Sequence, residues 1–520
     1  MKERLSRRDF LKIIGMVPLL KIAGDAITLN DRLPISQDRN TPNVLIIVFD
    51  ALSATNMSLH GYPRQTTPNI SKFAEISTVY NRHYSGGNFT SPGTASILTG
   101  TYPWSHRAFN LYGTVAKTFE DQSIFHSFPG ETYTRMAFTH NDLTSMLLYQ
   151  FAKDIDVFKK TKELCVFNEY LVAEGVFNND HNAAFLGEWM ITRGQRGQDL
   201  RLPSSLFLSI IQHIWRNKER QDASAKYKRL FPRGLPSTNA GPYVYLLEDA
   251  IDWVQSEIGN SNKPFLGYFH FLPPHEPYNT RRDFVNIFKD NWVPVKKPPH
   301  IFSEGYSEKV LNTNRQDYDE YVAYVDAEFG RLVDFIKKQG LLENTYVIFT
   351  SDHGEMFERG ILEHITPTLF EPIIHVPLII HQPGQVSRVD IQTPTSCVDL
   401  LPTINHVINQ PAPHASEGVV LPAFTEEPVQ IERSVFAVET KSNPKNAPLR
   451  SGTVAMIKDR YKLIHYLDYK DVDKQYELYD LINDPEELSN LYSSQRSLGQ
   501  DLQDELQAKI QEVNRPYQIK

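Results

Sequence analysis

Carboxylate and imidazole side chains follow several of the apolar runs in this sequence. Four of them come within a few residues of the end of such a run: Asp50, His275, Asp352 and His353. Carboxylate oxygens bind hard divalent cations, imidazole is compatible with Zn or Mn, and both groups serve in general acid–base catalysis. Taken singly, an aspartate after a strand caps a helix at least as often as it binds a metal. The four residues are far apart in the chain, so any shared chemistry depends on the fold that positions them.

The apolar runs themselves are rich in β-branched residues and predict strands that are buried on both faces, as in a parallel sheet. The predicted strands are residues 43–49, 265–271, 345–350 and 376–380. Helical patterns separate them, at residues 68–77, 243–258 and 316–338. Strands that alternate with helices predict an α/β fold, with a large, mostly parallel central sheet flanked by helices. Sites in such sheets lie at the carboxyl ends of the strands, so we expect the four residues to converge there.

Two other regions differ from this pattern. Short strand-like pieces in series predict a small antiparallel-sheet subdomain at residues 406–520, which a charged helix at about 497–513 closes. The main domain is expected at residues 41–405. Within it, residues from about 150 to 245 are richer in aromatic, Asn, Lys and Arg residues and contain one helix-like stretch, Leu206–Lys218. We interpret them as an insertion or cap beside the site, although they could equally be more of the main domain.

Composition excludes some classes of protein. The chain has 520 residues, 41% hydrophobic and 22% charged, which is ordinary for a globular protein. Its net charge of −8 gives no basic excess, so a nucleic-acid partner is not expected. The two cysteines, Cys165 and Cys397, form neither a CxxC metal site nor a disulfide framework. A single bridge between them and two free, buried thiols are the alternatives.

The N-terminus carries paired arginines, Arg7 and Arg8, followed by Asp-Phe-Leu-Lys and a modest apolar stretch. This pattern resembles a bacterial twin-arginine export signal. We therefore expect residues 1–38 to engage the twin-arginine export machinery, which would carry the folded protein to the periplasm or cell surface. No clear cleavage site follows, so the segment could remain as a membrane anchor, although its apolar stretch is short for a membrane span. A basic amphipathic first helix is the alternative interpretation.

Six motifs, in this order, resemble those of the sulfatase branch of the alkaline phosphatase superfamily. They lie at residues 43–73 (NVLIIVFD to ISKF), 88–100 (NFTSPGTASILTG), 271–278 (FLPPHEPY), 350–355 (TSDHGE), 363–379 (EH to VPLI) and 477–492 (ELYDLINDPEELSNLY). The resemblance covers about residues 42–150 and 243–492. It implies an alkaline phosphatase/sulfatase-like fold and a metal-dependent hydrolase or transferase of phosphate or sulfate esters.

The resemblance also implies roles for individual residues. A divalent cation (Ca, Mg, Mn or Zn, with a second ion allowed) would be bound by Asp50, Thr90, Asp352 and His353. Thr90 occupies the position of the nucleophile. His275 and His364 would contact the substrate, protonate the leaving group or bind a second metal; the alternative for each is a core histidine that bonds to the backbone. Weaker candidates for the site are His60, His106, His140 and Lys441.

The sequence departs from the family pattern at three positions. Thr90 replaces the Cys or Ser that sulfatases mature to formylglycine, Thr94 replaces an arginine, and Ala51 replaces a second aspartate. This pattern looks like the branches with a threonine nucleophile, which include phosphoethanolamine and glycerophosphate transferases and phosphoesterases. Those transferases usually carry several membrane spans, and none is predicted here, which favours a soluble or singly anchored enzyme.

The expected function is therefore hydrolysis or transfer of phosphate esters through Thr90, on a small-molecule, glycan or lipid ester. One alternative is a sulfatase that acts on sulfated glycans or small sulfate esters. A second alternative is a non-catalytic binding protein of the envelope surface.

Overall fold

The computed structural model describes residues 41–168, 218–238, 243–425, 433–470, 472 and 475–518. The predicted export signal lies outside these residues, as does the helix expected at Leu206–Lys218 except for its last residue. No helix of the described part of the chain is long and apolar enough to cross a membrane.

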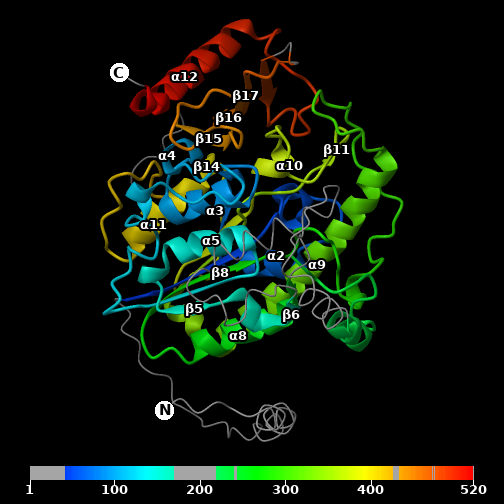
Figure 1. Cartoon of the computed structure of the whole chain (residues 1–520), viewed down its shortest axis with the longest axis vertical. Coiled ribbons are helices and arrows are strands. Elements are labelled where there is room, and N and C mark those ends of the chain that lie inside the picture. Colours follow the sequence, from blue (N-terminus) through cyan, green and yellow to red (C-terminus); the bar gives the residue numbers. More distant parts are fainter. Residues whose placement is uncertain are drawn as a thin grey trace, which may run out of the picture. The chain divides into compact units, whose positions relative to one another are not determined.

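An eight-stranded sheet forms the centre of the fold, where Figure 1 labels β8 and β5. Its strand order is β13-β2-β12-β9-β1-β8-β4-β5. Its strands are β1 (Asn43–Phe49), β2 (Thr78–Tyr80), β4 (Thr134–Thr139), β5 (Val157–Lys159), β8 (Phe265–Phe271), β9 (Thr345–Thr350), β12 (Leu378–His381) and β13 (Val389–Ile391). Strands β9, β1, β8, β4 and β5 run parallel to one another. The strand expected at 376–380 is present as β12, but it runs antiparallel to both of its neighbours. The sheet is thus mostly parallel, which confirms the predicted fold class.

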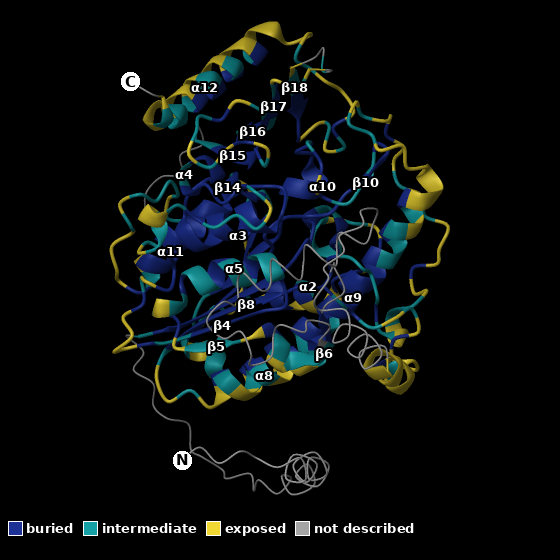
Figure 2. Ribbon diagram, viewed as in Figure 1, coloured by how far each residue is buried: buried dark blue, intermediate teal, exposed yellow. Residues whose placement is uncertain are grey.

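Helices cover both faces of this sheet. Every residue of β1 is fully buried, and successive side chains point to opposite faces, so one apolar run supplies two cores. The core on one face includes α3 (Thr90–Thr99), α5 (Asp142–Gln150) and α11 (Leu400–Val407). The core on the other includes α2 (Pro68–Ala74), α8 (Leu247–Gly259) and α9 (Glu308–Lys338). Figure 2 shows α3 fully buried, in contrast to the exposed outer face of α12 (Arg496–Asn514).

Two of the predicted helices begin at residues other than those expected from the sequence. The helix expected at 243–258 begins only at Leu247, because Tyr243–Tyr245 forms β7, which pairs with β6 (Cys165–Asn168). Helix α9 begins earlier than expected, at Glu308, where the Ser307 hydroxyl accepts a hydrogen bond from the Val310 amide and caps the first turn.

A second, antiparallel sheet confirms the predicted C-terminal strands. It consists of β15 (Ser434–Glu439), β16 (Gly452–Lys458), β17 (Tyr461–Leu467) and β18 (Tyr476–Asp480), in that order. The fully buried Lys462 of β17 contacts Glu371 at 2.9 Å and Glu487 at 2.5 Å. Glu371 begins α10 (Glu371–Ile374), so this ion cluster connects the second sheet to that helix.

The described chain also has shorter elements. They include α4 (Pro103–His106), the pair β3 (His83–Tyr84) and β14 (Thr395–Ser396), the pair β10 (Phe357–Glu358) and β11 (Ile361–Leu362), and 3₁₀ turns such as Ala54–Asn56 and Ser58–His60. Cys165 and Cys397 are both free thiols, so no bridge joins them. Cys397 is buried as expected, whereas Cys165 is only partly buried.

Candidate active site

Four neighbouring parallel strands end at the same edge of the central sheet. Their order is β9-β1-β8-β4, although their order in the chain is quite different. Each carries polar residues at or just after its carboxyl end: Asp352 and His353 follow β9, Asp50 follows β1, His270 is the penultimate residue of β8, and His140 and Asn141 follow β4. The sheet topology therefore brings these residues together from segments up to about three hundred residues apart.

Two carboxylates and two imidazoles form the centre of this cluster. Asp50 lies 3.2 Å from His353 Nε2 through Oδ1 and 3.2 Å from His270 Nε2 through Oδ2. Asp352 Oδ2 lies 3.7 Å from each of the same two nitrogens. All four side chains are essentially inaccessible to solvent. Ligand atoms of Asp50, His270 and Asp352 lie within 4.8 Å of one another, a spacing that a single cation can span.

The charges of this cluster favour a cation. Burial raises the pKa of Asp50, but hydrogen bonds with His270 and His353 outweigh it and hold that pKa well below its usual range. Burial and the neighbouring Asp50 carboxylate raise the pKa of Asp352. Burial alone would lower the pKa of His353, but Asp352 and Asp50 raise it to about 9. Two buried carboxylates this close repel each other, and oxygen and imidazole ligands together suit a divalent metal ion. The residues present therefore fit a bound cation.

Thr90 lies beside this cluster as the first residue of α3. Its hydroxyl oxygen is 3.4 Å from His353 Nε2 and accepts a hydrogen bond of 3.2 Å from Asn141 Nδ2. The same amide nitrogen donates to Asp50 Oδ2 at 2.5 Å, so Asn141 ties the hydroxyl to the carboxylate. Helix N-termini stabilise negative charge through free backbone N–H groups and the helix dipole. Thr90 is thus placed where an alkoxide or a bound anion is stabilised.

Close packing fixes α3 against the end of β9. A Cβ atom added at Gly93 would lie 2.2 Å from the Asp352 carbonyl oxygen, so only glycine allows this approach. Asn88, just before α3, donates to the His364 and Thr366 carbonyls at 3.1 and 2.8 Å. The first turn of α3, which carries Thr90, is therefore held by segments that carry other residues of the cluster.

His364 and His275 lie beside the cation ligands. The His364 ring is 4.2 Å from the His353 ring and 4.9 Å from the His275 ring, between centroids. His364 Nδ1 shares a 2.9 Å hydrogen bond with the buried Glu355 Oε1. Burial lowers the pKa of His364 well below its usual value, with His353 and His275 adding to the effect, and burial raises the pKa of Glu355 to about 8. His275 Nδ1 lies 3.0 Å from the Glu276 carbonyl oxygen.

The structure thus brings together all six residues expected at the site: Asp50, Thr90, His275, Asp352, His353 and His364. Sequence reasoning missed His270, Asn141 and Glu355. His270 is a histidine inside an otherwise aromatic and aliphatic strand, and this exception to the apolar pattern could have indicated a site residue. Asn141 was missed because β4 begins with polar residues and was not recognised as a strand.

The weaker candidates lie in different surroundings. His140 adjoins Asn141, and its ring stacks on Tyr245 at 4.0 Å, while neither ring nitrogen has a hydrogen-bond partner among the described residues. His106 is bonded to Ser96 of α3 at 3.1 Å, as a core histidine would be. Lys441 lies 3.9 Å from Glu439. Thr94, at the family's arginine position, donates to Asp352 Oδ2 at 3.4 Å.

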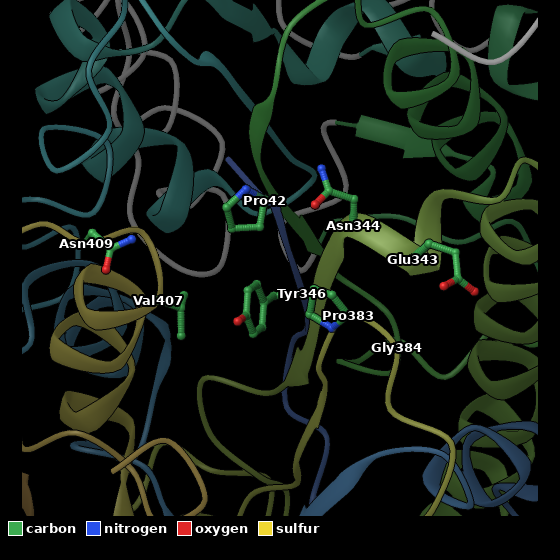
Figure 3. A pocket seen from close by; sticks show the side chains of 8 residues that line it. All are labelled: Pro42, Glu343, Asn344, Tyr346, Pro383, Gly384, Val407 and Asn409. Carbon is green, nitrogen blue, oxygen red and sulfur yellow. The ribbon is translucent and has the colours of Figure 1, made fainter. Parts of the chain in front are cut away.

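A pocket of about 620 Å³ lies at the opposite edge of the sheet, and Figure 3 shows the side chains that line it. Pro42, Asn344 and Tyr346, which line it, lie at the amino-terminal ends of β1 and β9. It contains none of the clustered residues, so it is separate from the candidate site.

Two family models match the chain. The sulfatase family model matches residues 42–172 and 208–409, and the model for the C-terminal region of N-sulphoglucosamine sulphohydrolase matches residues 366–516. An uncharacterised sulfatase of Escherichia coli K12 is 28% identical over 289 residues, which are 52% of this chain and 56% of that protein. The chain thus spans about half the length of that relative. An ulvan-active sulfatase of Formosa agariphila is 22% identical over 519 residues, 96% of this chain and 87% of that protein.

Among solved structures, a phosphonate monoester hydrolase of Agrobacterium radiobacter superimposes with a TM-score of 0.64 at 18% identity, over 91% of this chain and 96% of that one. This likeness supports the fold alone. The family model covers more than half of the chain, and the motifs and topology agree with it. The chain belongs to the sulfatase family of ester hydrolases.

Proposed function

We propose that this chain is a metal-dependent ester hydrolase or transferase that uses Thr90 as its nucleophile. The observation that carries the proposal is the Thr90 hydroxyl, which lies at the N-terminus of α3 within 3.4 Å of His353 and is tied through Asn141 to Asp50. Asp50, His270, Asp352 and His353 would bind the divalent cation, with Thr90 as a further oxygen ligand. When bound, the cation supplies charge that offsets the anionic ester and lowers the pKa of the threonine hydroxyl.

The remaining steps use residues of the chain. The Thr90 hydroxyl releases its proton to solvent water, the Thr90 oxygen forms a bond to the phosphorus or sulfur of the ester, and the bond to the leaving oxygen breaks. His364 donates its Nε2 proton to that leaving oxygen and takes a proton at Nδ1 from the hydrogen-bonded Glu355 carboxyl group, or His275 donates the proton instead. Water, or an acceptor alcohol in a transferase, then attacks the threonine ester and regenerates Thr90. Asn141 holds the threonine oxygen in place throughout through its 3.2 Å hydrogen bond.

The relatives favour sulfate esters over the phosphate esters that the sequence alone suggested. The family and its curated members are sulfatases, and one relative acts on ulvan, so a sulfated glycan or a small sulfate ester is the first substrate class to test. Because the proposed nucleophile is a threonine, phosphate esters are the second substrate class to test. A formylglycine hydrate can expel sulfate by collapsing to an aldehyde, but a threonine sulfate has no second hydroxyl and must be attacked at sulfur.

The test is turnover of matched aryl sulfate, phosphate monoester and phosphodiester substrates by the metal-loaded protein. Thr90→Ala should lower turnover at least about a thousandfold, because removing a nucleophile removes the covalent route. Thr99→Ala, at the other end of the same helix, is the matched control and should keep activity. Undiminished turnover by Thr90→Ala would refute the nucleophile. Cation binding without turnover of any ester would favour the non-catalytic alternative.

We also propose export through the twin-arginine machinery, because the N-terminal pattern with Arg7 and Arg8 resembles such a signal. Changing both arginines to lysine should keep the protein in the cytoplasm. Fractionation of cells that express each version checks this, and unchanged export of the double variant would reject it.

A further inference from the structure

Three glutamates lie beside the two histidines that flank the cation ligands. Glu276 directly follows His275 in the chain, and Glu363 directly precedes His364. The rings of these histidines are 4.9 Å apart, and the carboxyl groups of Glu276 and Glu363 share a hydrogen bond. Both glutamates are only half-buried, so a ligand can reach them. We call Glu276, Glu355 and Glu363 the glutamate cluster.

The charges that act most strongly on Glu363 are negative. Burial raises the pKa of Glu363 well above its usual value, and Glu276, through the shared hydrogen bond and its charge, raises it further, as do the charges of Glu355 and Glu304. The backbone of Glu363 has a positive φ of 72°, a conformation that is strained for any residue other than glycine. Carboxylates that are held together away from water repel one another. A cation bound among them would relieve this repulsion.

Two buried oxygen atoms of this region lack a hydrogen-bond partner among the described residues. They are Glu355 Oε2, whose neighbour Oε1 is bonded to His364, and Tyr278 Oη. Burial raises the pKa of Tyr278 well above its usual value, and the charges of the glutamate cluster add to the effect, which places this hydroxyl group among the carboxylates. Buried polar atoms without partners are rare and costly in native proteins. Both atoms can accept a hydrogen bond from a ligand.

An alkylammonium group fits these acceptors better than a metal ion does. A metal ion needs its ligand atoms close together, and among the described residues only the group at the centre of the candidate site brings three such atoms within 4.8 Å of one another. An ammonium group donates three hydrogen bonds that diverge from one nitrogen. The acceptors available to it are Glu355 Oε2, Tyr278 Oη and the pair formed by Glu276 and Glu363.

We propose that the glutamate cluster binds an alkylammonium group on the alcohol part of the ester substrate. The inference rests on the proposed function, in which His364 or His275 protonates the leaving oxygen and therefore lies beside the alcohol. Glu355 bonds to His364, and the other two glutamates adjoin the histidines in the chain, so the cluster lies on the leaving-group side of the reacting atom. An ammonium group held there would anchor the alcohol and direct its oxygen to the histidines. The preferred substrates are thus sulfate or phosphate esters of amino alcohols.

The first test measures binding, so it does not depend on turnover. ω-Aminoalkyl sulfonates with two, four and six carbons are titrated calorimetrically into the cation-loaded, full-length protein. Their partners are n-alkyl sulfonates in which a methyl group replaces the ammonium group. A sulfonate has a carbon–sulfur bond in place of the ester bond, so it is not hydrolysed. At least one amino sulfonate should bind about tenfold more tightly than its alkyl partner, a difference of about 1.4 kcal/mol.

The second test measures kcat/KM for the corresponding sulfate and phosphate esters. The amino ester should be preferred about tenfold over the alkyl ester, and the longer chains keep the ammonium group from activating the leaving oxygen. Glu276→Gln and Glu363→Gln should each reduce the preference roughly threefold or more, and the double variant should abolish it, because it removes the charge of the pair at nearly unchanged size. Neither residue takes part in the proposed proton transfers, so turnover of the alkyl ester should be unchanged.

Glu343→Gln is the matched control, because Glu343 is exposed and lines the pocket at the opposite edge of the sheet. This variant should keep the full preference for the amino compounds. Circular dichroism checks the fold of each variant, and the comparison of sulfonates on the unchanged protein stands even if a variant unfolds. The inference is overturned if amino and alkyl sulfonates bind equally, if the preference survives in the double variant, or if Glu343→Gln reduces it as much. Absence of turnover of every ester, aryl esters included, would instead refute the proposed function.

Discussion

Replacing Gly93 with alanine would push α3 away from the end of β9. The new Cβ atom would lie 2.2 Å from the Asp352 carbonyl oxygen and 2.9 Å from its carbon. Because non-bonded atoms pack at about 3.5 Å, the helix and strand must separate by about 1 Å. The contacted atoms belong to the backbone at the end of a central strand, which cannot rotate out of the way as a side chain can.

Thr90 would move with Gly93, since both belong to the first turn of α3. The 3.4 Å separation of the Thr90 hydroxyl from His353 and its 3.2 Å hydrogen bond with Asn141 would then lengthen. A misplacement of about 1 Å at a reacting group costs roughly a hundredfold in rate, and overpacking of a core costs about 1–3 kcal/mol of stability. We therefore expect kcat to fall about a hundredfold while the protein remains folded.

The assay is kcat on whichever aryl ester the protein hydrolyses, together with urea denaturation and calorimetric titration of the cation. Gly130→Ala is the matched control, because a Cβ there would meet only the flexible end of the Arg135 side chain, at 3.0 Å. Alanine has a higher helix propensity than glycine, so a loss of kcat or stability in Gly93→Ala would arise from the close contact and not from helix propensity. If Gly93→Ala keeps the kcat and stability of Gly130→Ala, close approach of α3 to β9 is not what positions Thr90.

Three further outcomes are expected. Glu355→Ala should lower kcat roughly tenfold or more for alkyl esters but little for aryl esters, because His364 would lose its orienting partner and poor leaving groups need its proton most. Glu355→Gln keeps a hydrogen-bond acceptor, so its loss of kcat should be smaller. Equal losses for alkyl and aryl esters would contradict this role of Glu355. Although burial alone would lower it, the neighbouring aspartates raise the pKa of His353 to about 9, so below that pH a proton must leave before a cation binds. Cation affinity measured by calorimetry should thus rise with pH towards about 9 and then level off, and a flat profile would argue against His353 as a ligand. Lys462→Met should lower the free energy of unfolding by about 3–5 kcal/mol in urea denaturation, because it leaves two buried glutamates uncompensated. Lys458→Met, at a partly exposed ion pair, should lower it by less than about 1 kcal/mol. Similar losses for the two variants would refute the role of burial.

The order of apolar runs and polar residues along the chain by itself determined much of the fold and of the candidate site. A buried parallel strand must be apolar on both faces, so β1, β8 and β9 were recognisable from their own residues. Polar residues directly after such strands had to lie at one edge of the sheet, which is why Asp50, Asp352 and His353 were expected to converge. These rules relate each strand to the residues next to it in the chain, so they can be applied to the sequence directly.

Other features depended on partners distant in sequence. The direction of β12 is set by which strands it joins, and its own apolar run is compatible with either direction. His270 and Asn141 belong to the site only because β8 and β4 lie next to β1, which places their side chains on Asp50 across separations of 220 and 91 residues. Glu355 likewise contacts His364 because the pair β10 and β11 turns the chain back on itself between them. These contacts follow from packing of the whole sheet, whose energy is shared among many residues, so only the tertiary structure decided which polar side chains lie together in the candidate site.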